Sequence, residues 1–117
     1  LRNYGTYPRV LGRYVRDDGV LGLEEAIRKM TAMPAARIGL SRRGVLKVGN
    51  VADIGIFDAN TVSDVYEWSK PHQYATGFRY VIVNGVPVID EAKRTTAFPG
   101  DVLKRQTERE HLSRPKD

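Results

Sequence analysis

Apolar and polar residues follow a helical period in the N-terminal third of the chain. On a helical wheel at about 100° per residue, the stretch from Tyr7 to Arg16 separates into two arcs. The apolar arc holds Val10, Leu11, Tyr14 and Val15, and the opposite arc holds Arg9, Arg13 and Arg16. Pro8 suits the first turn of a helix, and Gly19 suits a left-handed stop. The pattern predicts an amphipathic helix with a basic, solvated face.

A second helix is predicted in "LGLEEAIRKM". Its apolar face holds Leu23, Ala26, Ile27 and Met30, and its charged face holds Glu24, Glu25, Arg28 and Lys29. Glu25 and Lys29 are four residues apart, which favours an ion pair between them. Because proline disfavours helical backbone at the preceding residue, Pro34 should end this helix near Met33. A short further helical turn closed by Gly39 is expected after it.

From Gly44 onward β-branched residues become frequent and the pattern changes to that of strands. The segment "GVLKVGNVADIGIFD" predicts a short strand, a turn at Gly49-Asn50 and a second strand over Ala52–Phe57. A loop rich in turn-forming residues follows. The sequence then predicts a β-hairpin over 79–90, where two β-branched runs flank the type I′ dipeptide Asn84-Gly85.

The hairpin pattern also predicts a register. A two-residue turn pairs Val83 with Val86, Ile82 with Pro87 and Val81 with Val88. Pro87 has no N–H to donate to an outer neighbour, which indicates an edge strand. Both faces of the hairpin are apolar, so we expect it to be covered on both sides. The whole pattern is helical first and β-rich second, with a polar tail at the end.

Composition narrows the class of protein. The chain has 117 residues, 41% hydrophobic and 28% charged, which fits one small globular domain. It has no Cys, which excludes disulfides and thiolate metal sites and fits a reducing compartment, so we expect a cytoplasmic protein. No apolar run is long enough for a membrane helix, and we expect no membrane partner.

The net charge of +5 raises the question of an anionic partner. Five of the Lys and Arg residues lie in the C-terminal "KRQTEREHLSRPKD", among acidic residues. We interpret this segment as a solvated tail, which leaves the body only mildly basic. The loop aromatics have no basic cluster beside them, so we expect no nucleic-acid partner; they are Tyr66, Trp68 and Tyr74.

The residues alone supply no complete catalytic group. His72 lies in a loop and His111 in the polar tail, too far apart in sequence to indicate a zinc site without cysteines. Asp53 and Asp58 are five positions apart around a strand and therefore fall on opposite faces. We expect Asp53 to accept hydrogen bonds from turn N–H groups instead.

The chain nevertheless resembles a known family. The segments "RNYGTYPRVLGRYVR", "GLEEAIRKMTAMPAARIGL", "RGVLKVGNVADIGIFDANTVSD", "PHQYATG" and "YVIVNGVPVID" occur in this order. Together they resemble the C-terminal end of N-acyl-D-amino-acid deacylases (D-aminoacylases) of the amidohydrolase superfamily. The resemblance extends from Arg2 to about Leu103, and its "YGTYPRVLGRYVR" segment is the more specific to the D-aminoacylase branch.

The resemblance implies an α+β fragment. In that family, the C-terminal helices of a metal-dependent (β/α)₈ barrel are followed by strands of a small β-sandwich, here including the hairpin over 79–90. Residues 1–44 would then carry the last barrel loop and helices of the catalytic domain. Residues 45–98 would form the C-terminal part of the β-sandwich domain, and residues 99–117 a polar tail.

The resemblance also implies hydrolysis of the N-acyl bond of N-acyl-D-amino acids. The zinc ligands and the catalytic Asp of the family lie upstream, so we expect neither metal ligands nor catalytic residues in this chain and no activity from it alone. The last βα-loop of the barrel implies a substrate site here. We expect Arg2 to hold the substrate carboxylate, supported by Asn3 and Tyr4.

Two alternatives remain at this stage. The chain could be a fragment of another amidohydrolase, hydantoinase-like, urease-like or dihydroorotase-like, that shares only the β-sandwich. It could also be a free-standing basic interaction module, which would bind nucleic acid in a salt-sensitive way. As a fragment, the chain would lack the rest of the barrel as a partner, and we expect it to self-associate through exposed apolar surface.

Overall fold

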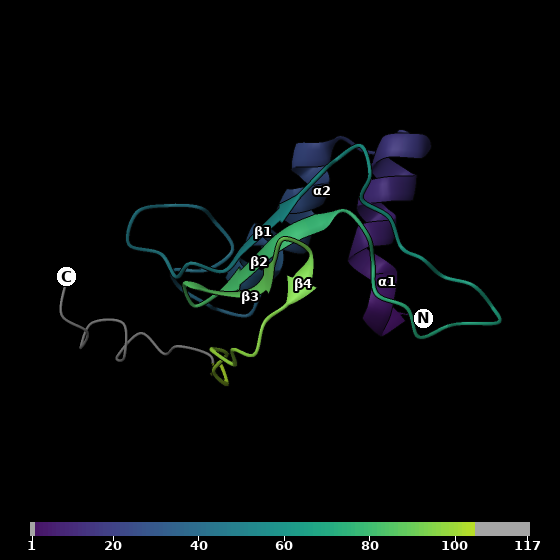
Figure 1. Ribbon diagram of the computed structural model, residues 1–117. Coiled ribbons are helices and arrows are strands. Elements are labelled where there is room, and N and C mark those ends of the chain that lie inside the picture. The colour runs from purple at the N-terminus through teal and green to yellow at the C-terminus, as the bar shows by residue number, and fades with distance from the viewer. Residues whose placement is uncertain (1, 105–117) are drawn as a thin grey trace.

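The structure, a computed structural model, describes residues 2–104 and combines helices with one antiparallel sheet (Figure 1). The helices are α1 (Arg2–Arg9), η1 (Val10–Asp17), α2 (Leu23–Met30) and α3 (Ala32–Arg37). The strands are β1 (Ile54–Phe57), β2 (Phe78–Val83), β3 (Val86–Asp90) and β4 (Lys93–Arg94), and the sheet has the order β1-β2-β3-β4. The predicted α+β class and the order of helices before strands are confirmed.

The first predicted helix is confirmed, but it is longer than the sequence pattern indicated. The helical backbone begins at Arg2, so Pro8 lies well inside α1 instead of in its first turn. Pro8 cannot donate to the carbonyl of Tyr4, four residues earlier. From Val10 the helix continues as the π-helix η1, and Gly19 follows with φ 60° as the predicted left-handed stop.

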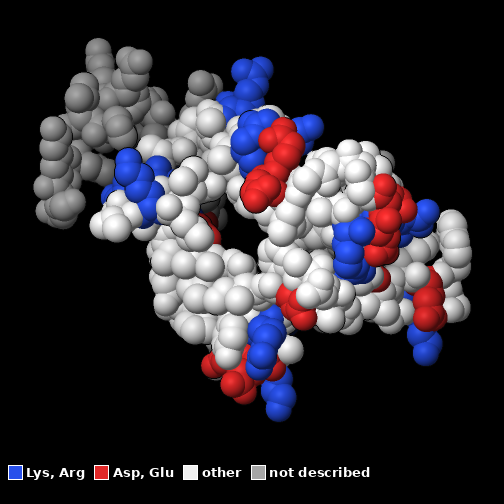
Figure 2. All heavy atoms as spheres, turned by 90° about the horizontal axis from the view of Figure 1, so that it is seen from above, with Lys and Arg blue, Asp and Glu red and all other residues white. Residues whose placement is uncertain are grey.

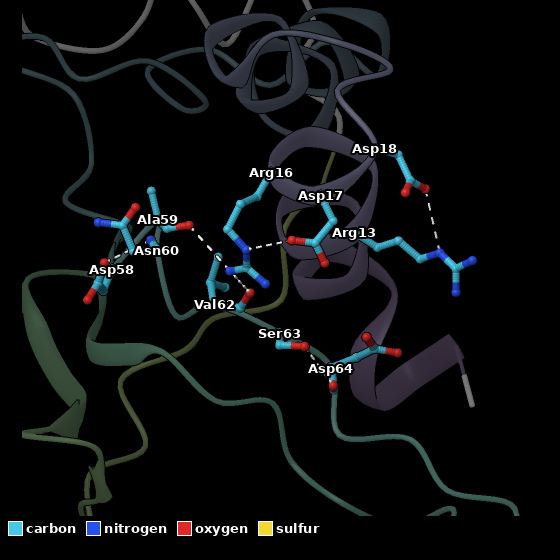
Figure 3. Close-up of polar contacts among 10 residues, drawn as sticks. All are labelled: Arg13, Arg16, Asp17, Asp18, Asp58, Ala59, Asn60, Val62, Ser63 and Asp64. Carbon is cyan, nitrogen blue, oxygen red and sulfur yellow. Dashed lines mark hydrogen bonds and ion pairs between the residues drawn. The ribbon is translucent and has the colours of Figure 1, made fainter.

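The predicted solvated face of this helix is observed only in part, because two of its three arginines also contact the loop after β1. Arg9 is half-buried and reaches Asp64, with 3.0 Å between Nη1 and Oδ2. Arg16 donates to the carbonyl of Val62 at 2.7 Å, and Figure 3 shows its guanidinium reaching the loop after β1. Only Arg13 faces outward, 3.6 Å from Asp18. The wheel could not show this, because the loop that covers the basic arc is distant in sequence.

The second helix is confirmed as α2, with its end shifted. The helix breaks at Thr31, where φ is −129° and ψ −78°, earlier than the predicted end near Met33. Pro34 then lies in the first turn of α3, where its missing N–H leaves no helical bond unmade. Gly39 follows α3 with φ 75°, as the sequence predicts.

The charged face of α2 pairs differently from the prediction. Glu25 accepts two hydrogen bonds from Arg28, from Nε and Nη2, both at 2.8 Å. Lys29 acts on Glu25 only as a nearby positive charge. The planar guanidinium offers a two-pronged donor that the lysine ammonium lacks, which favours Arg28 as the partner. The hydrogen bonds from Arg28 hold the pKa of Glu25 below its ordinary value.

This pair makes the stability of the chain depend on pH. The pKa of Glu25 is lower in the folded chain than in the unfolded chain, so the pair stabilises the fold above the ordinary carboxyl pKa. That stability is lost as the pH falls through the lowered pKa. Glu25→Gln is therefore expected to reduce the drop in the thermal midpoint between about pH 7 and about pH 3. Glu24→Gln, in the same turn but outside the pair, is the control; identical curves for both variants would contradict this.

The predicted strand before the Gly49-Asn50 turn does not form. The turn itself is present, with the Asn50 N–H donating to the carbonyl of Lys47 at 3.0 Å. Three apolar side chains of the segment are exposed: Val45, Leu46 and Val48, the last completely. Within residues 2–104, β1 has a neighbouring strand on one side only, so this segment has no ladder to join. The following strand, β1, begins at Ile54, two residues later than predicted.

The predicted hairpin forms, and its register agrees with the prediction next to the turn but differs farther from it. Asn84 and Gly85 have φ of 51° and 79°, and the pairs Val83–Val86 and Ile82–Pro87 form. Beyond a bulge the register shifts, so Val81 pairs with Ile89 and not with Val88. The Asp53 carboxylate accepts a hydrogen bond from the Asn84 N–H at 2.8 Å, which confirms the prediction that it binds turn N–H groups. It also forms an ion pair with Arg43.

Neither the edge position of β3 nor the cover on both its faces is observed. The chain turns back after β3 into β4, which pairs at Ile89 and Asp90, beyond Pro87. The proline therefore blocks no pair that β4 makes. No side chain of β2 or β3 is fully buried, and Val86 is 40% exposed. The sheet side chains that pack against the buried core beneath the helices are Phe57 and Phe78.

The core lies where the helices meet the loop after β1. Leu11, Ala26 and Val62 form its buried centre, and Val62 has no exposed surface. The surrounding side chains are partly buried: Val10, Val15, Leu21, Ile27, Met30, Phe57 and Phe78. Among the residues that the structure describes, the most deeply buried side chain is thus one from a loop. The loop after β1 is therefore part of the packing that fixes the first helix.

Candidate functional site

The three residues expected to bind substrate lie together in the first turn of α1. The sequence predicted that Arg2, Asn3 and Tyr4 belong to a loop, but the backbone is helical from Arg2 onward. Asn3 is exposed and Tyr4 is half-buried. The helical backbone fixes the spacing of the three Cα positions, which a loop would leave free.

Tyr4 connects this turn to the distant segment "PHQYATG". Its ring lies edge-on to that of His72, with 5.4 Å between centroids, and 5.9 Å from that of Tyr74. Such arrangements suit the quadrupoles of aromatic rings. Figure 1 shows the loop between β1 and β2 running along the α1 and η1 helices and returning beside the N-terminal end. The structure thus gives His72 a packing role beside the candidate site.

An open groove of about 390 Å³ begins at this turn. Its lining comes from α1 and the loop after β1: Tyr4, Gly5, Thr6, Arg9, Asp64, Val65, Tyr66, Trp68, Pro71 and Gln73. The Asp64 side chain is 15% exposed and that of Arg9 40%. The hydrogen bond to Asp64 is the main reason that the pKa of Arg9 lies above its ordinary value. The groove therefore has aromatic walls around one ion pair.

The described residues do not fit a metal ion. Between residues 2 and 104, no group of three or more His, Cys, Asp or Glu side chains gathers in a metal-binding arrangement. His72 lies edge-on to the Tyr4 ring, and no second ligand of these types is grouped with it in the described part of the chain. Zinc needs three or four such ligands around one point. We therefore derive no chemical step from a metal held by these residues.

The charge distribution gives little support to a nucleic-acid surface. Each arginine on the first helix after Arg2 has a carboxylate partner: Arg9 with Asp64, Arg13 with Asp18 and Arg16 with Asp17. On the face shown in Figure 2, acidic and basic side chains lie side by side in clusters separated by wide uncharged areas. Phosphate binding instead favours a continuous basic stripe.

The family follows from comparison with known proteins. The model of the amidohydrolase family matches residues 2–89, which include α1, the loop after β1 that lines the groove, and all but the last residue of the hairpin. The chain belongs to the amidohydrolase family.

Particular relatives narrow the similarity. The chain is 47% identical over 104 residues to a D-aminoacylase of Alcaligenes xylosoxydans xylosoxydans, a match that spans 89% of this chain and 22% of the relative. It is 45% identical to the N-acyl-D-glutamate deacylase of Bordetella bronchiseptica, whose crystal structure contains zinc and a phosphonate mimic of the tetrahedral intermediate. The two structures align with a TM-score of 0.70 over 72% of this chain and 18% of that one.

A dihydroorotase of Endomicrobium trichonymphae is also similar, 55% identical over 54 residues. That match spans 46% of this chain and 12% of the relative. The deacylase similarity is therefore much longer, while the dihydroorotase similarity is confined to less than half of the chain. In each case this chain spans about a fifth or less of the relative's length.

Some expectations fall outside the structure. Leu1, His111 and most of the predicted polar tail lie outside the described residues. Within the described part, no helix is both long and apolar enough to cross a membrane. The cytoplasmic localisation stays a prediction.

Sequence reasoning missed the residues that hold the site together. Gly5 and the Ser63–Thr76 bridge gave no signal, and Asp64 gave only a weak one, because each acts through a partner far away in the chain. The weak signal is that Asp64 is an acidic residue in a loop where no nearby turn N–H groups are obvious partners for its carboxylate. That signal does not identify Arg9, 55 positions away, as the partner.

Proposed function

We propose that this chain is the C-terminal portion of a metal-dependent enzyme that hydrolyses the N-acyl bond of N-acyl-D-amino acids. The observation that carries the proposal is the 47% identity to a D-aminoacylase over 89% of the chain. An N-acyl-D-glutamate deacylase shares the fold of the same region, at 45% identity. Residues 2–104 hold no group of metal ligands, and we propose that the zinc ligands and the catalytic Asp lie in a part of the enzyme outside this chain.

The contribution of this chain would be to bind and orient substrate. A free α-carboxylate distinguishes an N-acyl-amino acid from a simple amide, and an arginine holds a carboxylate through two parallel hydrogen bonds. Arg2 stands at the start of α1, where we propose that it holds this carboxylate. Asn3 and Tyr4 would complete the binding turn, with Tyr4 fixed by its contacts to His72 and Tyr74.

The proposal divides the chain into three parts. Residues 1–44 would close the (β/α)₈ barrel, residues 45–98 would belong to the small β-sandwich, and residues 99–117 would form the tail. The sharp turn at Gly44, with φ 81° and the Thr31 carbonyl 2.8 Å from where a Cβ would stand, supports a boundary there. A second candidate, a dihydroorotase, is favoured by a match to under half of the chain and ranks lower for that reason.

The rest of the enzyme would cover apolar surface that the described residues leave open. Val45 is 55% exposed, Leu46 79% and Val48 100%, in a segment whose sequence is that of a strand. One edge of β1 is also unpaired among the described strands. Exposed apolar side chains and an open strand edge each favour pairing with another chain.

The isolated chain is therefore expected to self-associate. Sedimentation should show the weight-average mass rising with concentration in the micromolar range, and Leu46→Lys with Val48→Lys should reverse this rise. Two lysines placed instead at the exposed Val20 and Leu103 control for net charge. A monomer at all concentrations, with a sharp thermal transition at high temperature, would contradict the expectation.

A chimera tests the proposed function. In the Alcaligenes D-aminoacylase, the aligned segment is replaced by residues 2–104 of this chain. The chimera is expected to release the free amino acid from N-acetyl-D-methionine and not from its L-enantiomer, while deletion of the segment abolishes the activity. A folded, zinc-loaded chimera without N-acyl-D-amino acid hydrolysis would overturn the proposal.

A further inference from the structure

One acidic side chain contacts α1 at two separate points. The Asp64 carboxylate accepts a hydrogen bond from Arg9 at 3.0 Å. Its Cβ lies only 2.7 Å from the point where a side chain on Gly5 would begin. The backbone of the first turn therefore rests directly on Asp64, and the ion pair holds the same helix one turn further along. Gly5 follows immediately after Tyr4, the last residue of the proposed binding turn.

Asp64 is itself fixed to the sheet. The preceding residue, Ser63, pairs with Thr76 through two backbone hydrogen bonds of 3.2 and 3.0 Å, just before β2 begins. The Ser63 hydroxyl donates to the carbonyl of Asp64 at 2.9 Å. Figure 3 shows this stretch beside the helix, with Arg16 contacting the Val62 carbonyl. A continuous set of contacts thus links the sheet to the first turn of α1.

We propose that Asp64 is a positioning residue, which sets the place of the Arg2–Tyr4 turn relative to the sheet. Asp18 offers a contrast on the same helix, because its ion pair with Arg13 is longer, at 3.6 Å, and both side chains are about half exposed. Asp64 is 15% exposed and contacts backbone as well as the arginine. The consequence for catalysis rests on the proposed function, in which Arg2 holds the substrate carboxylate.

Steady-state kinetics of the chimera test this role. Asp64→Asn keeps the side-chain shape and removes its charge; it is expected to raise KM for N-acetyl-D-methionine about tenfold and to change kcat less than about threefold. Carboxylate binding is shared by ground and transition states, so its loss appears in KM. Asp18→Asn, the matched substitution, should leave both constants unchanged.

A double-mutant cycle separates positioning from a purely structural role. If Asp64 acts through Arg2, then Asp64→Asn should add nothing in a chimera that already carries Arg2→Ala. Fully additive losses in KM would overturn the proposal, as would an unchanged KM in the single variant.

Hydrogen exchange on the isolated chain tests the geometry without activity. Asp64→Asn is expected to speed exchange of the backbone N–H groups of residues 6–9 about fivefold or more, relative to Asp18→Asn. Equal exchange in the two variants would overturn the positioning role even if the chimera is active. An inactive chimera together with faster exchange in Asp64→Asn would reject the proposed function while supporting the link between Asp64 and α1.

Discussion

Replacing Gly77 with alanine is expected to lower the free energy of unfolding of the isolated chain by about 3 kcal/mol. Gly77 has φ 90°, in the region that favours glycine. A Cβ there would lie 2.5 Å from the Cα of Val62 and 2.6 Å from its N. Both atoms are backbone, so the clash is relieved only by moving the loop that supplies the best buried side chain of the core.

Gly49 provides a matched control. Its φ is 88°, almost that of Gly77, but nothing lies within 4 Å of its Cβ position. Gly49→Ala should therefore show the backbone strain alone, about 1 kcal/mol. Both losses in unfolding free energy can be measured by urea unfolding followed by far-ultraviolet circular dichroism. The protein concentration must be low enough to keep the chain monomeric. Equal losses would show that the packing of Val62 against Gly77 contributes nothing.

Replacing Arg2 with alanine in the chimera is expected to lower kcat/KM for N-acyl-D-amino acids about a hundredfold, which corresponds to about 2.7 kcal/mol. The loss should appear mainly in KM, for the reason given for Asp64. Arg2→Lys keeps the positive charge but lacks the two-pronged donor. Its kcat/KM should therefore lie between that of the unsubstituted chimera and that of Arg2→Ala.

A second substrate that lacks the α-carboxylate shows whether the effect of Arg2→Ala arises from carboxylate binding. An N-acylamine without the α-carboxylate offers Arg2 nothing to bind, so the Arg2→Ala change should leave its slow hydrolysis unaltered. Arg13→Ala, on the outer side of the same helix, should alter neither substrate. Unchanged constants for N-acyl-D-amino acids in Arg2→Ala would remove the carboxylate anchor from the account.

The parts of the fold that were predictable are those decided by neighbouring residues. The apolar stripe of α2, the left-handed Gly19 and Gly39, and the Asn84-Gly85 turn each follow from local geometry. The family resemblance, carried by segments such as "YGTYPRVLGRYVR", agrees with the match of the amidohydrolase model over residues 2–89.

The parts that sequence reasoning missed depend on distant partners. The wheel assigned Arg9 and Arg16 to solvent because it could not place the loop containing Val62 and Asp64. The strand predicted before Gly49 has an apolar sequence but no neighbouring strand among the described residues. The register beyond Ile82 shifts at a bulge, which periodicity alone does not locate.

The central claim is that this chain completes a deacylase and not another amidohydrolase. Its most direct test places residues 2–104 in two hosts, the Alcaligenes D-aminoacylase and the Endomicrobium dihydroorotase, each with its own aligned segment removed. We expect that the first host recovers hydrolysis of N-acetyl-D-methionine and that the second does not recover hydrolysis of dihydroorotate. Recovery in the dihydroorotase host alone would contradict the claim.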